Sequence, residues 1–156
     1  MTAVYTFVSR WRAPATREHC WEVLSATLSP RDAGREPAPW WPDVTIVEAP
    51  TRIEPGSVIR LDVRSPFGYR LRVRLELTRV DAPTSLAAVS EGDLRGEGIL
   101  DIVPAEEGSV LTWTWRVSVR RPWMRATGWL LRPLFVVAHT FVMRRGERGF
   151  ARVLAA

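Results

Sequence analysis

Few side chains in this 156-residue chain are suited to acid–base, nucleophilic or metal chemistry. The chain has two histidines, His19 and His139, and one cysteine, Cys20. All 22 basic residues are arginines, and lysine, asparagine and glutamine are absent. Schiff-base chemistry and lysine-dependent phosphate loops are therefore excluded. Histidine, cysteine and carboxylate residues do not recur at ligand spacing, so we expect no metal site and no cofactor.

His139 is the strongest candidate for a functional polar group. It stands in the otherwise apolar run of residues 135–143, within a predicted helix. A histidine in such a place can direct a hydrogen-bonding or proton-transferring group into a ligand cavity. The alternative is a buried histidine whose polar atoms are satisfied by a backbone or carboxylate partner. The sequence leaves both interpretations open.

The chain is rich in tryptophan, with eight in all. Trp40 and Trp41 precede Pro42, and Trp113 and Trp115 lie on one face of a predicted strand. Each indole ring can bury about 150–250 Å² of surface. Any single ring can simply fill the core, but a set of this size favours some lining of an apolar cleft.

Residues 91–98 combine three glycines with four charged residues. Such a composition is typical of a bulge, or of a close approach between backbones at the end of a strand. Two interpretations follow. The segment is a hairpin with solvated charges, or Asp93, Arg95 or Glu97 reaches the mouth of a pocket.

Alternation of apolar and polar residues predicts seven antiparallel strands. They are expected at residues 5–12, 44–49, 57–64, 69–80, 85–94, 98–103 and 110–119. Thr16 predicts the start of a short helix over residues 17–28, and residues 29–39 predict a loop with one further helical turn. Residues 122–154 predict one long, mostly apolar helix.

The predicted strands have one polar and one apolar face, most clearly over residues 69–80 and 110–119. An antiparallel sheet of this kind needs cover on its apolar face. The long C-terminal helix is the element large enough to provide it. The expected fold class is α+β, with one domain over residues 1–156.

The order and spacing of several motifs resemble the START-like (SRPBCC) superfamily of helix-grip domains, in particular its polyketide cyclase/dehydrase-like group of bacterial proteins. The motifs are Trp11-Arg12-Ala13-Pro14 with Trp21-Glu22-Val23-Leu24, Trp40-Trp41-Pro42, residues 92–98 and residues 138–150. The resemblance covers nearly the whole chain. It implies a curved antiparallel sheet wrapped around the C-terminal helix, two short helices after the first strand, and a hydrophobic cavity between sheet and helix.

Members of such families bind lipids, sterols, polyketides or plant hormones, and some catalyse aromatic cyclisation or dehydration. We therefore expect a hydrophobic small molecule, such as a lipid or polyketide, in the cavity. The expected ligand-binding residues are Trp40, Trp41, Tyr69, Leu71, Val73, Trp113, Trp115, Phe135, His139 and Met143. The alternative is a cyclase or dehydratase in which His139 is the candidate catalytic residue, with Arg116, Asp93 or Glu97 as its polar partner.

The net charge of +5 and the pI near 10.8 would suit an acidic partner. The arginines are, however, spread among acidic residues, which is typical of a solvated surface. The basic and aromatic residues of 120–133 make contact with an anionic membrane a further alternative, which is not favoured because the strands need the same helix as their cover. The face of Arg70, Arg72 and Arg74 has no aromatic residue for base stacking, so no nucleic-acid partner is expected. The lone cysteine and the absence of a signal-like N-terminus predict a cytoplasmic protein, and the sequence does not indicate its oligomeric state.

Overall fold

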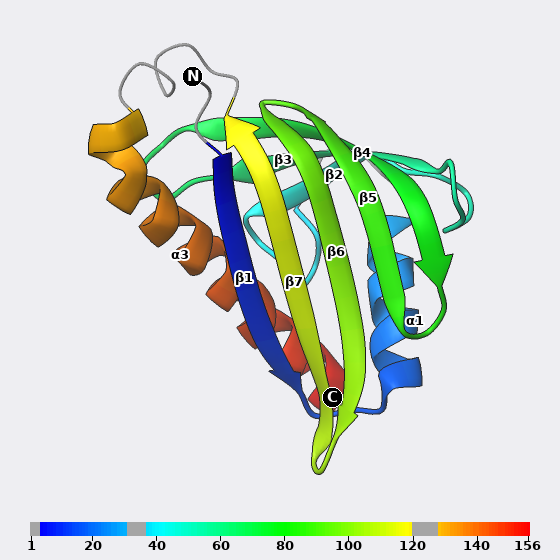
Figure 1. The fold of residues 1–156 in the computed structure, drawn as a ribbon. Helices are drawn as coiled ribbons and strands as arrows, with labels where there is room; N and C mark the ends of the chain where they lie inside the picture. Colours follow the sequence, from blue (N-terminus) through cyan, green and yellow to red (C-terminus); the bar gives the residue numbers. More distant parts are fainter. Residues whose placement is uncertain (1–3, 31–36, 120–127) are drawn as a thin grey trace.

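The computed structural model describes residues 4–30, 37–119 and 128–156, and Figure 1 shows their arrangement. In chain order the elements are β1 (Val4–Ala13), α1 (Arg17–Leu28), β2 (Val44–Glu48), β3 (Val58–Arg64), β4 (Arg70–Asp81), β5 (Ser85–Gly92), β6 (Leu94–Ala105), β7 (Gly108–Val119) and α3 (Gly128–Ala155). The seven strands form one antiparallel sheet in the order β1-β7-β6-β5-β4-β3-β2.

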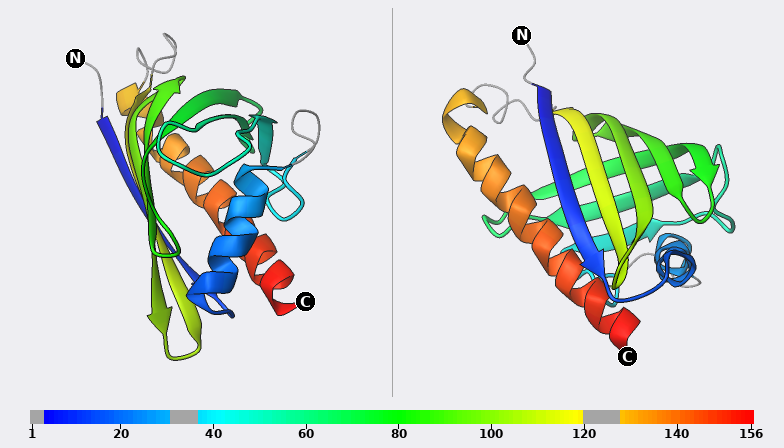
Figure 2. Two further views of the ribbon diagram at one scale, coloured as in Figure 1. Left: turned by 90° about the vertical axis from the view of Figure 1, so that its right-hand side faces the viewer. Right: turned by 60° about the horizontal axis from the view of Figure 1, so that its bottom comes forward.

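The sheet curls, and both described helices lie on its concave side (Figure 2). This arrangement confirms the predicted α+β helix-grip fold. Of the two short helices expected after the first strand, α1 is present. Residues 31–36, where a second one would fall, lie outside the described residues. The same is true of residues 120–127, which include the expected start of the long helix and most of the basic–aromatic pattern.

The predicted two-faced strands explain why the sheet needs the helix. Along β4, Val73 and Leu75 are buried on the concave face, whereas Arg70 and Arg72 are exposed on the other. In β7 the side chain of Leu111 is likewise buried. Burying the apolar face stabilises the fold by about 25 cal/mol for each Å² removed from water. α3 therefore lies where the strand pattern requires a cover.

The strands β5 and β6 differ from the prediction. A turn was expected near residues 95–97, but β5 ends at Gly92 and β6 begins at Leu94. Gly92 has a φ of +98°, which other residues adopt rarely, so it makes this tight connection possible. Asp93 Oδ2 accepts a hydrogen bond from the Arg72 backbone N–H (2.8 Å), which fixes the turn against β4. The glycine-rich segment is therefore mostly strand.

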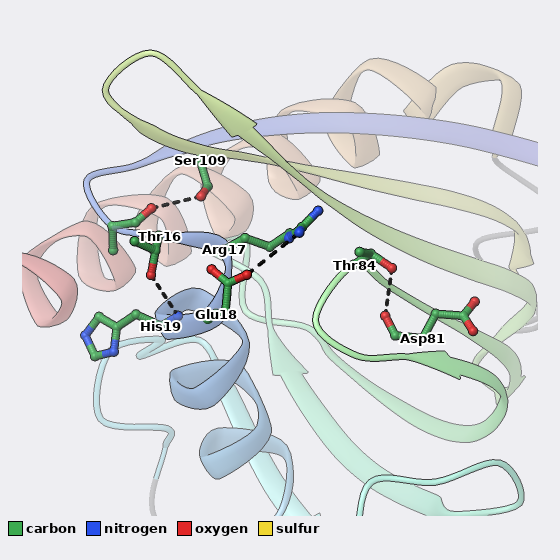
Figure 3. A network of polar contacts seen from close by, with 8 residues as sticks. Thr16, Arg17, Glu18, His19, Asp81, Thr84 and Ser109 are labelled. Carbon is green, nitrogen blue, oxygen red and sulfur yellow. Dashed lines mark hydrogen bonds and ion pairs between the residues drawn. The ribbon is translucent and has the colours of Figure 1, made fainter.

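Helix α1 is fixed at its start by polar contacts, which Figure 3 shows from close by. Thr16 Oγ1 accepts a hydrogen bond from the backbone N–H of His19 (3.2 Å), as expected of an N-cap. The Ser109 hydroxyl donates to the Ala15 carbonyl (2.8 Å), which ties the entry of α1 to the beginning of β7. These contacts position α1 across one end of the sheet, where Leu24 is buried against it.

Candidate ligand-binding cavity

An apolar cavity of ≈ 170 Å³ lies between the concave face of the sheet and helices α1 and α3. All ten residues expected from the sequence to bind the ligand line it. They are Trp40, Trp41, Tyr69, Leu71, Val73, Trp113, Trp115, Phe135, His139 and Met143. The structure thus brings together residues from β4, β7, α3 and the segment before β2. Their part in ligand binding stays a prediction.

Other lining residues were missed in the sequence. Tyr5 and Phe7 belong to the edge strand β1. They alternate with exposed residues along the strand as far as Trp11, and this period-two pattern could have identified them as facing the cavity. Ala138 lies one helical turn before Val142, on the face of α3 that also carries Phe135, so helical spacing could have found it. Leu24 and Thr27 of α1 also line the cavity. Their place in the lining depends on the path of α1 across the sheet, which the sequence alone does not reveal.

A cluster of aromatic rings forms part of the cavity wall through Trp40, Trp41 and Trp113. The centroid of the Trp11 ring, behind this wall, lies 5.2 Å from that of Trp41, 4.9 Å from that of Trp113 and 5.8 Å from that of Phe150. The indole N–H of Trp40 donates to the hydroxyl of Thr27 (2.7 Å). Because these rings pack in tilted and edge-on contacts, this part of the wall is both apolar and well fixed.

Two glycines of α3 allow Trp40 and Trp41 to reach the helix. The indole N–H of Trp41 donates to the carbonyl of Val142 (3.0 Å). A Cβ on Gly146 would lie 2.6 Å from the Trp41 ring, and one on Gly149 would overlap the Trp40 carbonyl. The absence of side chains at these two positions therefore sets how closely the tryptophan pair approaches α3.

A second aromatic group, made of Tyr5, Tyr69 and Phe135, also lines the cavity. The Phe135 ring makes edge-on contacts with Tyr5 (5.9 Å between centroids) and Tyr69 (6.3 Å). The Arg132 guanidinium lies 5.0 Å from the centre of the Tyr5 ring, as in a cation–π contact. Burial raises the pKa of Tyr69, and a hydrogen bond with Ser65 acts in the opposite direction. Tyr69 is therefore an uncharged phenol at neutral pH.

His139 lies on the cavity wall, stacked on Phe7 with 4.2 Å between ring centroids and 18° between planes. Its Nε2 atom is buried and has no hydrogen-bond partner among the described residues. Burial lowers the pKa of His139 from 6.5 to about 4. The imidazole is consequently neutral at pH 7.

The polar partners considered for His139 are not brought to it. Asp93 binds the backbone of Arg72, as described above, and is not part of the cavity lining. Arg116 and Glu97 face each other across β6 and β7 and are exposed. Within the described ranges, every lining residue of the cavity is uncharged at neutral pH.

The described residues hold no group of three or more histidine, cysteine, aspartate or glutamate residues suited to a metal ion. No described helix has an apolar stretch long enough to cross a membrane.

No protein-family model matches the chain, and none of the curated proteins compared matches it either. Solved structures do. TTHA0849 from Thermus thermophilus superposes with a TM-score of 0.65 at 18% identity, over 97% of this chain and 99% of that one. Protein Ms6760 from Mycobacterium smegmatis gives a TM-score of 0.64 at 15% identity, over 99% and 92%. StfQ, a di-domain ARO/CYC of the steffimycin biosynthetic pathway, gives a TM-score of 0.58 at 16% identity, over 97% of this chain and 52% of StfQ.

At these identities the likeness concerns the fold. It extends over nearly the full length of this chain and includes an ARO/CYC protein, in agreement with the resemblance seen in the sequence motifs. The chain shares the helix-grip architecture of these solved structures.

Proposed function

We propose that this protein binds a hydrophobic small molecule in the cavity between the sheet and α3. The observation that carries the proposal is the apolar cavity itself, with a volume of ≈ 170 Å³. An engineered apolar cavity of about 150 Å³ remains dry and binds benzene, so a space of this size accepts a small apolar molecule. Transfer of the ligand's apolar surface out of water drives the binding.

The aromatic walls favour a ligand with rings. Tyr5, Phe7, Trp113, Trp115 and Phe135 all line the cavity and offer faces and edges for ring contacts. The shared fold with the ARO/CYC protein StfQ supports a polyketide-like or similar cyclic molecule over a long acyl chain. A fold hosts many functions, so the site carries more weight than this likeness.

A cyclase or dehydratase reaction at His139 receives less support. An imidazole whose pKa is about 4 is a weak base at neutral pH. No carboxylate lines the cavity in the described part of the chain, so none orients the ring or stabilises its protonated form. Ligand binding therefore accounts for the lining of the cavity without requiring a catalytic base or a carboxylate partner for it.

Titration with N-phenyl-1-naphthylamine, an uncharged dye that fluoresces in apolar surroundings, tests the proposal. We expect a saturable rise in fluorescence with one site per chain. Ala138 lines the cavity and is 4% exposed, so Ala138→Leu places extra carbon atoms in the ligand's space. This variant should weaken dye binding at least about tenfold, equivalent to the roughly 1.4 kcal/mol that separates decades of affinity.

Thr140→Leu is the matched control, because Thr140 lies on the exposed side of the same helix. It adds a similar apolar group outside the cavity and should leave the affinity unchanged. Dye binding that does not saturate, or that Ala138→Leu leaves intact in a folded protein, would contradict the proposed function.

A further inference from the structure

The lining of the cavity contrasts with the rest of the molecule in charge. The chain carries a net charge of +5, yet every lining residue within the described ranges is uncharged at neutral pH. An ionised carboxylate or phosphate entering this space would lose its hydration and meet no cation among the described lining residues. The cavity is therefore matched to a ligand that carries no charge.

Two polar atoms of the lining residues lack hydrogen-bond partners within the described ranges. They are Nε1 of Trp113 and Nε2 of His139, and both are buried. By contrast, the indole nitrogens of Trp40 and Trp41 do have partners, since Trp40 donates to Thr27 and Trp41 donates to the Val142 carbonyl. A buried polar atom without a partner is unfavourable, and a ligand group that bonds to it removes the penalty.

The chemistry of the two nitrogens specifies the kind of group that fits. An indole N–H can only donate a hydrogen bond, so Trp113 requires an acceptor. A neutral imidazole offers one donor and one acceptor, so Nε2 of His139 can bond to a carbonyl or to a hydroxyl. Because both atoms are buried and their residues line the cavity, a ligand in the cavity reaches them by displacing the side chains that cover them.

We propose that the cavity selects an uncharged, ring-containing ligand with a carbonyl-type acceptor, which binds the indole N–H of Trp113, with Nε2 of His139 as the second polar contact. This inference rests on the proposed function, since it specifies the ligand of the same site. It divides hydrophobic molecules into two groups. Neutral ketones, esters and related cyclic molecules fit, whereas free fatty acids and other anions do not.

Three compounds of nearly equal shape test the proposal by equilibrium dialysis at neutral pH. They are 2-acetylnaphthalene, which has a carbonyl; 2-ethylnaphthalene, which has a methylene group in its place; and 2-naphthoate, which is an anion. We expect the naphthoate to bind at least about 100-fold more weakly than the ketone, because its charge has no partner in the cavity. The positive net charge of the protein would by itself favour the anion, so a preference for the ketone would have to come from the cavity.

Variants locate the hydrogen bonds. Trp113→Phe removes the indole nitrogen and His139→Phe removes both imidazole nitrogens, and each variant keeps an aromatic ring. Each should shift the affinity ratio of ketone to ethyl compound toward the ethyl compound by about twofold to tenfold, the range expected for one hydrogen bond. Trp21→Phe is the control, because it removes an indole nitrogen from a residue of α1 that does not line the cavity. Its ratio should stay that of the parent protein.

The outcomes separate this inference from the proposed function. If neither the neutral naphthalenes nor N-phenyl-1-naphthylamine binds, the proposed function itself fails. If the naphthoate binds as tightly as the ketone, the cavity still binds ligands but does not select against charge. If the ratio stays unchanged in both Trp113→Phe and His139→Phe, with circular dichroism showing both folded, the two nitrogens are not the polar contacts.

Discussion

His139 illustrates how the surroundings of a residue decide its chemistry. Its ring is stacked on Phe7, and its Nε2 atom is enclosed without a partner among the described residues. Under these conditions protonation would place a charge in an apolar space, which explains the direction of its pKa shift. A place on the cavity wall was one of the two interpretations of this histidine that the sequence left open. It could not predict the missing carboxylate, because Asp93 and Glu97 are placed by the turn and the pairing of distant strands.

The titration of His139 predicts how stability depends on pH. In the unfolded chain the group binds a proton near pH 6.5, but in the folded protein only near pH 4, so protons favour the unfolded state between these values. The contribution of His139 to the free energy of unfolding should therefore fall by roughly 3 kcal/mol as the pH decreases from 6.5 to 4. Urea denaturation across this range measures it.

The variant His139→Leu separates this contribution from those of other groups. It should lose the part of the pH dependence that His139 causes. The free energy of unfolding of the parent, minus that of the variant, should therefore increase as the pH rises from 4 to 6.5. Parallel curves for the two proteins would contradict the neutral state assigned to His139.

At the scale of elements, the contact between α3 and the Trp40-Trp41 segment holds the two sides of the cavity together. Within a helix, alanine is normally more favourable than glycine by about 1 kcal/mol. At Gly146 the opposite result is expected, because a Cβ would lie 2.6 Å from Trp41 and 2.9 Å from Trp11. Gly146→Ala should lower the free energy of unfolding by about 1–3 kcal/mol, as overpacking of a core does. Chemical denaturation measures the change.

Thr140→Ala serves as the control for the Gly146 variant, since it changes helix propensity at an exposed position of the same helix. It should be neutral or slightly stabilising. A Gly146→Ala protein as stable as its parent would mean that the tryptophan pair can move away from α3 without loss.

The elements themselves were largely predictable, and their junctions were not. Period-two alternation placed the strands because one face of each is buried, as in β4 and β7. The expected turn near residues 95–97 was wrong because three glycines suggested a break, whereas β6 uses Gly98 to accommodate the Trp115 ring, 2.9 Å from where a Cβ would stand. Such a requirement depends on the partner strand, which local sequence does not reveal.

At the scale of the whole molecule, none of the described arginines lines the cavity, and the described lining residues are uncharged. Helix α3 repeats this division, with Arg144, Arg145 and Arg148 exposed and Ala138 and Val142 facing the core. The charge of these arginines therefore acts at the surface rather than on the ligand.

This separation predicts that salt has little effect on the binding of a neutral ligand. The affinity for N-phenyl-1-naphthylamine should change less than about twofold between low and high sodium chloride, since screening acts on exposed charges. Its sulfonated analogue, 1-anilinonaphthalene-8-sulfonate, should bind through surface arginines and weaken as salt is added. Fluorescence titration of both dyes at several salt concentrations measures this, and a strong salt dependence for the neutral dye would contradict it.

The two borders of the open sheet are protected against pairing with other chains. β1 is long, but the Arg12 backbone N–H on it donates to Glu147 Oε2 of α3 (2.9 Å), so the helix occupies that border. At the other border, β2 has only five residues, and its pairing with β3 is irregular between Ile46 and Glu48. Unguarded strand borders recruit further strands and lead to aggregation. The long helix α3 thus also protects the protein against fibril formation. If it detached, it would expose β1, which is long enough to pair with a strand of another molecule.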